Sequence, residues 1–329
     1  MSDRRPRVLV TRRIPEAGLA IVRDAAEVDL WEDPLPPPRD ELLRRVAGVD
    51  GLLALLTDRV DDALLDAAGP GLRVVSNFAV GVDNIDLAAC ARRGIPVGNT
   101  PGVLTEATAD IAFALLLAAA RRIPEARDFV RADRWQTWGP LDFLGKDLSG
   151  ATLGIVGFGR IGREVAKRGR GFGMRIVYHS RTRADAAVEA ETGATPLGFH
   201  ELLATSDFVS IHVDLNPTTR GLFGAEAIGR MRPGAILVNT ARGPVVDQVA
   251  LHAALTSGHL FAAGLDVTDP EPLRGDHPLL ALPNCLIVPH IASATVRTRD
   301  AMATKAARNL VAGLRGAPLP DPVPLPAAG

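Results

Sequence analysis

Three residues capable of acid–base or anion-binding chemistry follow short apolar runs in the second half of the chain. Arg242 comes after AILVNTA, Glu271 after GLDVTDP and His290 after CLIVP. In open α/β sheets, ligands bind beyond the carboxyl ends of the strands, so we expect these side chains on one edge of a sheet. Taken singly, each also fits an ordinary structural role: a surface salt bridge for Arg242, a turn for Glu271 and a satisfied polar residue at a strand end for His290.

Together the three side chains suit the reduction of a 2-oxo acid. A guanidinium holds a carboxylate through two parallel hydrogen bonds and polarises the neighbouring carbonyl. An imidazolium donates a proton to the carbonyl oxygen as hydride reaches the carbon, and a carboxylate beside the histidine favours its charged form and fixes its tautomer. We therefore predict Arg242, Glu271 and His290 as catalytic residues, with the hydride carried by a cofactor.

A glycine motif, GFGRIG at 157–162, lies between the apolar run LGIV and a helical pattern. In a dinucleotide site the first glycine permits a tight turn, the second lets the backbone approach the pyrophosphate, and the third allows close helix–strand packing. The N-terminus of the following helix would supply free N–H groups. A glycine-rich turn in another kind of α/β protein is the alternative.

The residue that usually grips the ribose hydroxyls, about 20 residues further on, is expected to be acidic. Here that position holds Ser180, and Arg181, Thr182 and Arg183 follow it. A carboxylate would repel a 2′-phosphate, whereas hydroxyl and guanidinium groups bind one. The turn thus predicts NADPH as the preferred cofactor, with NADH also usable. Solvated loop cations are the alternative interpretation of the two arginines.

The pattern of apolar runs predicts an α/β protein of two domains, which also suits 329 residues. The strands are almost continuously apolar, which is typical of parallel sheets buried on both faces. Predicted strands cover 7–11, 51–57, 72–78 and 95–100, and six more follow residue 150 with helices between them. Other expected elements are a helix at 17–25, a proline-rich loop at 33–40, a long helix at 105–122, a connector at 134–150, a last helix near 294–313 and an extended or disordered tail.

Composition limits the remaining possibilities. The 37 basic and 38 acidic residues nearly balance, so no nucleic-acid footprint is expected. The two cysteines have no metal-ligand spacing and fit free thiols in a reducing cytosol, with a disulfide as the alternative, so we expect a cytoplasmic protein without a metal. The N-terminus lacks a signal-peptide pattern, and the run IAFALLLAAA is too short to span a membrane.

Six motifs carry a resemblance to a known family: NFAVGVDNIDL, GIVGFGRIG, SDFVSIHV, MRPGAILVNTARGPVVD, AAGLDVTDPEPL and PHIASAT. The chain resembles the D-isomer-specific 2-hydroxyacid dehydrogenases over nearly its whole length, and most of all the glyoxylate/hydroxypyruvate reductases. The resemblance implies two Rossmann-like/flavodoxin-like domains with parallel sheets and the active site in the cleft between them. It implies a discontinuous substrate domain, 1–101 with 291–329, around a dinucleotide domain, 102–290. It also implies a homodimer, with the long helix and the connector at the interface.

The same resemblance assigns roles to residues. Arg242 would bind substrate, Glu271 would support the histidine, and His290 would be the general acid/base. The implied cofactor contacts are Thr108, Gly157, Gly159, Arg160, Ile161, Gly162, Ser180, Arg181, Thr182, Arg183, Val213, Pro217, Thr240, Ala241, Arg242, Asp266 (at the nicotinamide carboxamide), His290 and Ala292. The implied substrate contacts are Val80 and Gly81 (through backbone N–H groups), Arg242, His290, Ser293 and the partner subunit's Trp138.

The expected reaction is the reduction of glyoxylate and hydroxypyruvate to glycolate and D-glycerate. A 2-ketogluconate reductase or another D-2-hydroxyacid dehydrogenase is the alternative among enzymes. A dinucleotide-binding corepressor is the alternative of another class, because such proteins resemble this family and can keep the three residues. Ala292 and Asp214 stand where many members have glycine and proline, which bears on fine specificity. Glu271 argues against formate dehydrogenase-like members, which carry glutamine there.

Overall fold

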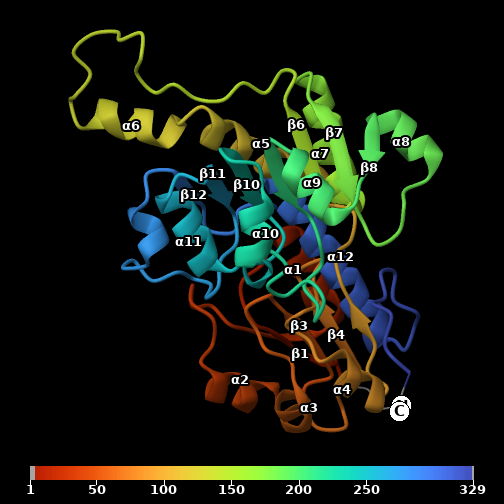
Figure 1. Cartoon of the computed structure of the whole chain (residues 1–329). Coiled ribbons are helices and arrows are strands. Elements are labelled where there is room, and N and C mark those ends of the chain that lie inside the picture. Colours follow the sequence, from red (N-terminus) through yellow and green to blue (C-terminus); the bar gives the residue numbers. More distant parts are fainter. Residues whose placement is uncertain (1–3, 328–329) are drawn as a thin grey trace. The chain divides into compact units, whose positions relative to one another are not determined.

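The computed structural model describes residues 4–327 and divides the chain into two compact units, coloured along the sequence in Figure 1. Unit 1 comprises the chain up to Leu104 and from Ala294 onward, and unit 2 runs from Thr105 to Ser293. The divisions thus lie at 104 and 293, where the sequence suggested 101 and 290. Each unit is built around its own parallel sheet.

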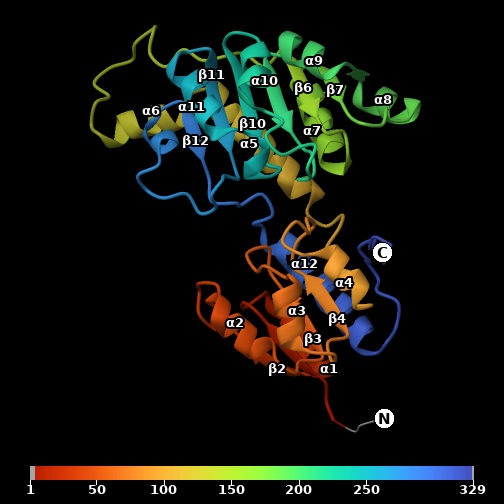
Figure 2. The ribbon, with the colours of Figure 1, turned by 60° about the horizontal axis from the view of Figure 1, so that its bottom comes forward.

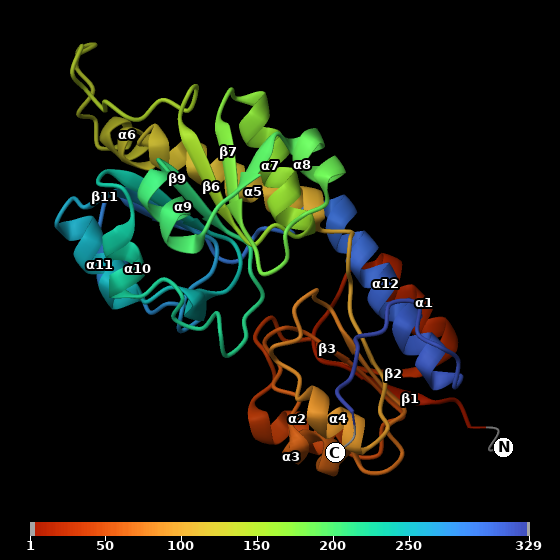
Figure 3. The same ribbon diagram turned by 45° about the vertical axis from the view of Figure 1, so that its right-hand side comes forward.

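The sheet of unit 1 has the order β2-β1-β3-β4-β5, and each neighbouring pair is parallel. Its strands are β1 (Arg7–Val10), β2 (Glu27–Leu30), β3 (Gly51–Ala54), β4 (Val74–Asn77) and β5 (Val97–Gly98). Its helices are α1 (Glu16–Ala25), α2 (Arg39–Val46), α3 (Asp62–Ala68), α4 (Leu87–Arg92) and α12 (Val296–Leu314). Helices α1 and α12 cover one face, and α2, α3 and α4 cover the other (Figures 2 and 3). This is the flavodoxin-like arrangement.

The C-terminal tail is extended and pairs with the end of this sheet. Pro322 bridges Gly98 in antiparallel fashion, and the N–H of Val323 donates to the carbonyl of Val97 at 2.8 Å. Lys305 of α12 forms an ion pair with Asp321 at 2.6 Å. The tail through residue 327 is therefore held against unit 1, and residues 328–329 lie outside the described part.

The sheet of unit 2 has the order β12-β11-β10-β9-β6-β7-β8, again parallel throughout. Its strands are β6 (Thr152–Val156), β7 (Arg175–His179), β8 (Ala194–Pro196), β9 (Phe208–Ile211), β10 (Ala235–Asn239), β11 (Leu260–Leu265) and β12 (Cys285–Ile287). The chain reverses its direction of travel across the sheet between β6 and β9, which makes this pair the topological switch point. The fold class expected from the sequence, two parallel-sheet α/β domains, is confirmed, with β8 added at the edge.

The helices of unit 2 are α5 (Thr105–Ala120), α6 (Ile123–Arg131), α7 (Arg160–Gly171), α8 (Ala186–Thr192), α9 (Phe199–Thr205), α10 (Ala225–Arg230) and α11 (Gln248–Thr256), with short 3₁₀ turns η1 (Gly243–Val245) and η2 (Pro278–Ala281). Helices α5 and α7 pack on one face of the sheet. Helices α9, α10 and α11 pack on the other. The sheet is thus buried on both sides, as its apolar strands require.

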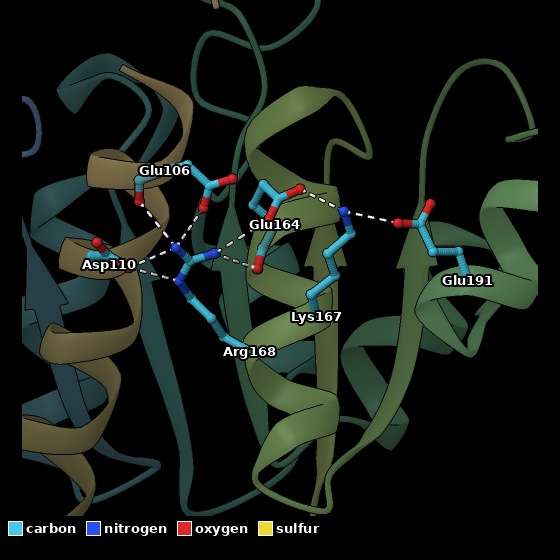
Figure 4. Close-up of polar contacts among 6 residues, drawn as sticks. All are labelled: Glu106, Asp110, Glu164, Lys167, Arg168 and Glu191. Carbon is cyan, nitrogen blue, oxygen red and sulfur yellow. Dashed lines mark hydrogen bonds and ion pairs between the residues drawn. The ribbon is translucent and has the colours of Figure 1, made fainter. Parts of the chain in front are cut away.

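Helix α7 is fastened to its neighbours by ion pairs (Figure 4). The guanidinium of Arg168 contacts Asp110 at 2.6 Å and Glu106 at 2.8 Å, both on α5. Lys167 bridges Glu164 of α7 and Glu191 of α8, at 2.8 and 2.9 Å. The Arg168 side chain is only 22% exposed, so its pairs are screened less than fully solvated ones. The N-terminus of α7, which follows the glycine motif, is therefore carried on a fixed helix.

Candidate active site

The glycine turn after β6 has the geometry that its sequence predicts. Gly157 has a φ of +95°, and a Cβ there would lie 2.4 Å from the carbonyl oxygen of His212. A Cβ on Gly162 would lie 2.2 Å from the carbonyl oxygen of Gly157. Only glycine fits either position. Beside Gly159 no described atom would meet a Cβ, so the open space there is on the side from which a ligand can approach the backbone.

Helix α7 begins directly at this turn, with Gly159 as its N-cap and no side chain capping it. The N–H groups of its first turn are therefore available to an anion, and the helix dipole favours one. A dinucleotide diphosphate fits this combination of glycine turn and uncapped helix end.

The polar turn after β7 is organised around Glu189 of α8. Arg183 makes a bidentate ion pair with Glu189, with its Nε at 2.9 Å from Oε1 and its Nη2 at 2.9 Å from Oε2. The hydroxyl of the buried Tyr178 donates to Glu189 at 2.6 Å and accepts from the N–H of Ala184 at 2.9 Å. Hydrogen bonds from Arg183 and Tyr178 lower the pKa of Glu189 to about 2, so the carboxylate stays charged. The guanidinium of Arg183 is thus already paired with a carboxylate of the same chain segment.

Arg181 differs from Arg183 in this turn. It is exposed, and its guanidinium makes no hydrogen bond or ion pair with any described residue. Ser180 is half-buried and Thr182 is exposed. Of the two arginines predicted from the sequence, Arg181 is therefore the one whose full set of donors is available to a ligand.

His290 and Glu271 form a hydrogen-bonded pair beyond the strand ends. The Nδ1 of His290 lies 2.6 Å from Oε1 of Glu271, with the two side chains 24% and 34% exposed. The second oxygen of Glu271 accepts from the N–H of Thr268 at 3.3 Å. Burial raises the pKa of Glu271, but the hydrogen bond and charge of His290, helped by Thr268 and Arg242, outweigh it and leave that pKa below its usual value. The carboxylate is therefore ionised and leaves Nε2 of His290 for a substrate.

Asp266 shapes the turn that carries the histidine. Its carboxylate accepts from the N–H groups of Ile291 at 2.7 Å and Ala292 at 3.0 Å, and its carbonyl accepts from the N–H of His290 at 3.0 Å. His290 has a φ of +52°, a left-handed conformation that is uncommon for a residue other than glycine. The buried Asp266 thus holds His290 in this conformation, in addition to any contact that it makes with a cofactor. Burial raises the pKa of Asp266, against the effect of these hydrogen bonds.

Arg242 follows β10 in a turn held by Asn239. The buried Asn239 side chain donates to the carbonyl of Arg242 at 2.9 Å and accepts from the N–H of Ala241 at 2.9 Å. One guanidinium nitrogen of Arg242 donates to the carbonyl of Ala241 at 2.8 Å. Asn239 was not predicted as a site residue, because its only signal in the sequence is an amide at a strand end before Arg242.

A second histidine at this edge, His212 after β9, is excluded as a proton donor. Its ring contacts Ser210 through Nε2 at 2.8 Å, and burial lowers its pKa to about 3. The imidazole is therefore neutral at physiological pH. Of the two histidines that follow strands β9 and β12, only His290 is paired with a carboxylate.

The structure gathers most of the predicted residues at the carboxyl edge of the unit 2 sheet. Each of the strands β6, β7, β9, β10, β11 and β12 is followed by some of them. In chain order they are Gly157, Gly159, Arg160, Ile161, Gly162, Ser180, Arg181, Thr182, Arg183, Val213, Pro217, Thr240, Ala241, Arg242, Asp266, Glu271, His290, Ala292 and Ser293.

Four predicted residues lie elsewhere. Thr108 is buried in the first turn of α5. Val80 and Gly81 lie in unit 1, in the loop after β4. Trp138 lies in the segment after α6 and is 78% exposed. Their assigned contacts stay predictions.

Neither a metal site nor a membrane span is found in the described part of the chain. No group of three or more His, Cys, Asp or Glu residues in it could hold a metal ion, and no helix in it is both long and apolar enough to cross a bilayer. Cys90 and Cys285 are free thiols. Burial raises their pKa values to about 11 and about 12, so neither is a thiolate at physiological pH.

Residues 113–292 match the family model of the D-isomer specific 2-hydroxyacid dehydrogenase NAD-binding domain. This match covers more than half of the chain and includes the glycine turn, Arg242, Glu271 and His290. The chain belongs to the D-isomer-specific 2-hydroxyacid dehydrogenases. It is an NAD(P)-dependent oxidoreductase acting on CH–OH donors, so the enzyme class predicted from the sequence is confirmed.

Curated relatives and similar solved structures agree with the assignment. The chain is 51% identical over 316 residues to a glyoxylate reductase of Thermococcus litoralis, with 95% of each chain covered. It is 48% identical over 325 residues to the human glyoxylate reductase/hydroxypyruvate reductase, covering 97% of this chain and 98% of the human one. It superimposes with a TM-score of 0.84, at 35% identity and 97% coverage of both chains, on an NADPH-dependent glyoxylate/hydroxypyruvate reductase of Sinorhizobium meliloti solved with NADP and malonate.

Proposed function

We propose that this enzyme reduces glyoxylate and hydroxypyruvate to glycolate and D-glycerate and prefers NADPH to NADH. The observation that carries the proposal is the 2.6 Å pair between His290 and the ionised Glu271, with Arg242 near enough to affect Glu271 electrostatically. Relatives about half identical to the chain are named for these reductions.

Each of the three residues has a distinct part in the reaction. A nicotinamide cofactor supplies the hydride to the carbonyl carbon when it is bound. Arg242 holds the substrate carboxylate and polarises the carbonyl. The Nε2 of protonated His290 gives its proton to the carbonyl oxygen, while Glu271 holds Nδ1 and so fixes the ring.

The proposal is tested with a panel of substrates and both cofactors. The panel contains glyoxylate, hydroxypyruvate, pyruvate, 2-ketogluconate and phenylpyruvate, each with NADPH and with NADH. We expect the highest kcat/KM for glyoxylate or hydroxypyruvate with NADPH. A higher value for 2-ketogluconate or phenylpyruvate would replace the proposed substrate with the alternative.

The turn after β7 supports the cofactor preference. It presents no carboxylate at Ser180, and the guanidinium of Arg181 is exposed and unengaged by the described residues. A 2′-phosphate beside Arg181 would gain charge-assisted hydrogen bonds that the ribose hydroxyl of NADH does not. The relative solved with NADP is itself described as NADPH-dependent.

Glu271→Gln should move the basic limb of the pH profile for reduction to lower pH. Glutamine keeps the size of the side chain but removes the negative charge that stabilises the imidazolium, so the proton needed for reduction is lost at lower pH. The measurement is kcat/KM for glyoxylate from about pH 5 to 9, with NADPH saturating. Glu226→Gln on α10, which removes a surface carboxylate paired with Arg230, is the matched control for loss of a carboxylate. If the pH profile of Glu271→Gln matches that of the wild-type enzyme, Glu271 has only a structural role in its turn.

Exposed apolar side chains support a homodimer. Helix α6 buries none of its residues, and Trp135, Trp138, Leu141 and Leu144 after it are 64%, 78%, 78% and 60% exposed. Figure 1 shows α6 and this segment extending from the body of unit 2. Concentrations of exposed large apolar residues mark association surfaces, so we assign this segment to a dimer contact.

The two free thiols of the chain fit the reducing cytoplasm as the compartment of the enzyme.

Trp138→Ala should change the preference between glyoxylate and hydroxypyruvate while the dimer persists. The reason is that Trp138, 78% exposed in its own chain, is proposed to line the site of the partner subunit. Trp135→Ala is the matched control, because Trp135 is another exposed tryptophan of the same segment. The measurements are kcat/KM for both substrates and mass by light scattering. An equal loss for both substrates, or dissociation alone, would leave Trp138 as an ordinary interface aromatic.

A further inference from the structure

The loop after β4 is held by asparagine side chains in unit 1. The Nδ2 of Asn99, just after β5, donates to the carbonyl of Val80 at 2.7 Å. The Nδ2 of Asn77, the last residue of β4, donates to the carbonyl of Gly81 at 2.8 Å. Asn77 is fully buried and Asn99 is half-buried, whereas Val80 and Gly81 are partly exposed. Two consecutive carbonyls are thus turned toward the interior of unit 1.

A third carbonyl of the loop is tied in the same way, because the N–H of Thr100 donates to Ala79 at 3.0 Å. In a trans peptide the N–H points opposite to the carbonyl, and these peptides are not among the cis bonds of the described chain. The N–H groups of Val80, Gly81 and Val82 therefore point away from the asparagines. Among the described residues, none of these three N–H groups donates a hydrogen bond. A run of successive free N–H groups is a concavity suited to an anion.

The two asparagines are themselves fixed. The carbonyl of Asn99 accepts from Asn309 of α12 at 2.9 Å, and its N–H donates to the carbonyl of Asp321 in the tail at 3.2 Å. Asn77 donates also to Asn84 at 3.1 Å, and Asn84 donates to the carbonyl of Leu55 at 3.0 Å. Hydrogen bonds thus connect the loop both to the C-terminal tail and to Leu55, the residue after β3.

We infer that Asn99 and Asn77 are positioning residues that aim the N–H groups of Gly81 and its neighbours at the substrate carboxylate. The inference rests on the proposed function, because glyoxylate and hydroxypyruvate each carry a carboxylate that these N–H groups could receive. If Asn99 is lost, the peptide between Val80 and Gly81 can rotate, and the N–H of Gly81 is no longer presented. The variant loses binding free energy at the substrate carboxylate. Because the enzyme binds this carboxylate equally in the ground state and in the transition state, KM should rise and kcat should stay the same.

The test is Asn99→Leu, which keeps the size of the side chain without the donor and without adding charge. Loss of one hydrogen bond to a charged group should raise KM for glyoxylate about 10-fold or more, with kcat nearly unchanged. Oxalate, which carries carboxylates but no reducible carbonyl, should bind the enzyme–NADPH complex more weakly by a similar factor in calorimetric titration. Asn99→Ser, which is polar but too short to reach Val80, should show the same changes and covers a folding failure of the leucine variant.

Asn284→Leu is the matched control. The Asn284 side chain also donates to backbone carbonyls, those of Phe261 at 3.1 Å and Leu255 at 3.4 Å, but in unit 2. It should alter thermal stability without raising KM for glyoxylate. NADPH affinity should be unchanged in the Asn99 variants.

Two failures can be told apart. If the wild-type enzyme reduces glyoxylate but the folded Asn99 variants keep its KM and its oxalate affinity, or lose kcat at constant KM, the positioning role is overturned and the proposed function stands. If the wild-type enzyme fails to reduce glyoxylate, the proposed function falls. In that case unweakened oxalate binding in the Asn99 variants overturns the positioning role, and weakened binding supports it independently of turnover.

Discussion

His290→Ala should lower kcat/KM for glyoxylate by about 10²–10⁴-fold, the range that a general acid contributes. The residue carries the proton for the carbonyl oxygen, and the neighbouring His212 cannot replace it because burial keeps its ring neutral. The alanine variant also leaves Glu271 without its hydrogen-bond partner at 2.6 Å. The charge of the ionised Glu271 is then no longer balanced by an imidazolium near the oxygen on which negative charge develops, so the upper part of the range is expected.

The loss should be confined to chemistry. NADPH binding, measured by fluorescence, should survive, since the glycine turn and Arg181 are untouched. His252→Ala on α11 is the matched control for removal of a histidine and should keep full activity. Near wild-type turnover of His290→Ala at neutral pH would remove His290 from the mechanism.

The pair of His290 and Glu271 could be predicted from the sequence because both residues closely follow strands, which can be recognised from nearby residues alone. A residue just beyond the carboxyl end of a parallel strand lies at the ligand edge of the sheet whatever the details of packing. The role of the glycine motif could be predicted for the same reason. The strand–turn–helix unit by itself requires the positive φ of Gly157 and the close backbone contact at Gly162. Neither prediction required knowing which distant segment packs where.

Elements without a local signal were missed. Helix α6 is separated from α5 by Arg121 and Arg122, and Arg122 has a φ of +53°. An arginine, unlike a glycine, gives no signal in the sequence for such a left-handed conformation. Strands β2 and β8, EVDL and ATP, are short edge strands without an apolar run. They are strands because a neighbouring strand pairs with them, which is a tertiary effect that overrides propensity.

Hydrogen bonds made by side chains with other elements could not be predicted from the sequence either. Arg181 and Arg183 look equivalent in the sequence, and only the placement of α8 beside β7 gives one of them to Glu189. The contact between Asn309 and Asn99 joins positions 210 residues apart. The chemistry of a site can thus be predicted from strand ends, whereas the residues that orient it depend on packing.

Arg181→Ala should lower the preference for NADPH over NADH by about 10–100-fold, the loss of one hydrogen bond to a charged group. The affected interaction exists only with the 2′-phosphate, so kcat/KM with NADPH should fall while that with NADH changes little. The effect follows from exposure: within the described chain no residue engages the Arg181 guanidinium, and no other partner has to be given up when a phosphate binds.

Arg183→Ala separates this role from general positive charge in the turn. Arg183 already neutralises Glu189 through two contacts of 2.9 Å, so it has less to offer a phosphate and its loss should change the cofactor ratio less than loss of Arg181. Arg230→Ala on α10, where the arginine pairs with Glu226 at the surface, is the control for removal of an exposed arginine and should leave the ratio unchanged.

Ser180→Asp should reverse the preference, since its carboxylate repels the phosphate and accepts hydrogen bonds from the ribose hydroxyls of NADH. If the native enzyme uses both cofactors equally, or if Arg181→Ala weakens both alike, Arg181 is a solvated loop residue and the absence of a carboxylate at Ser180 has no bearing on cofactor choice.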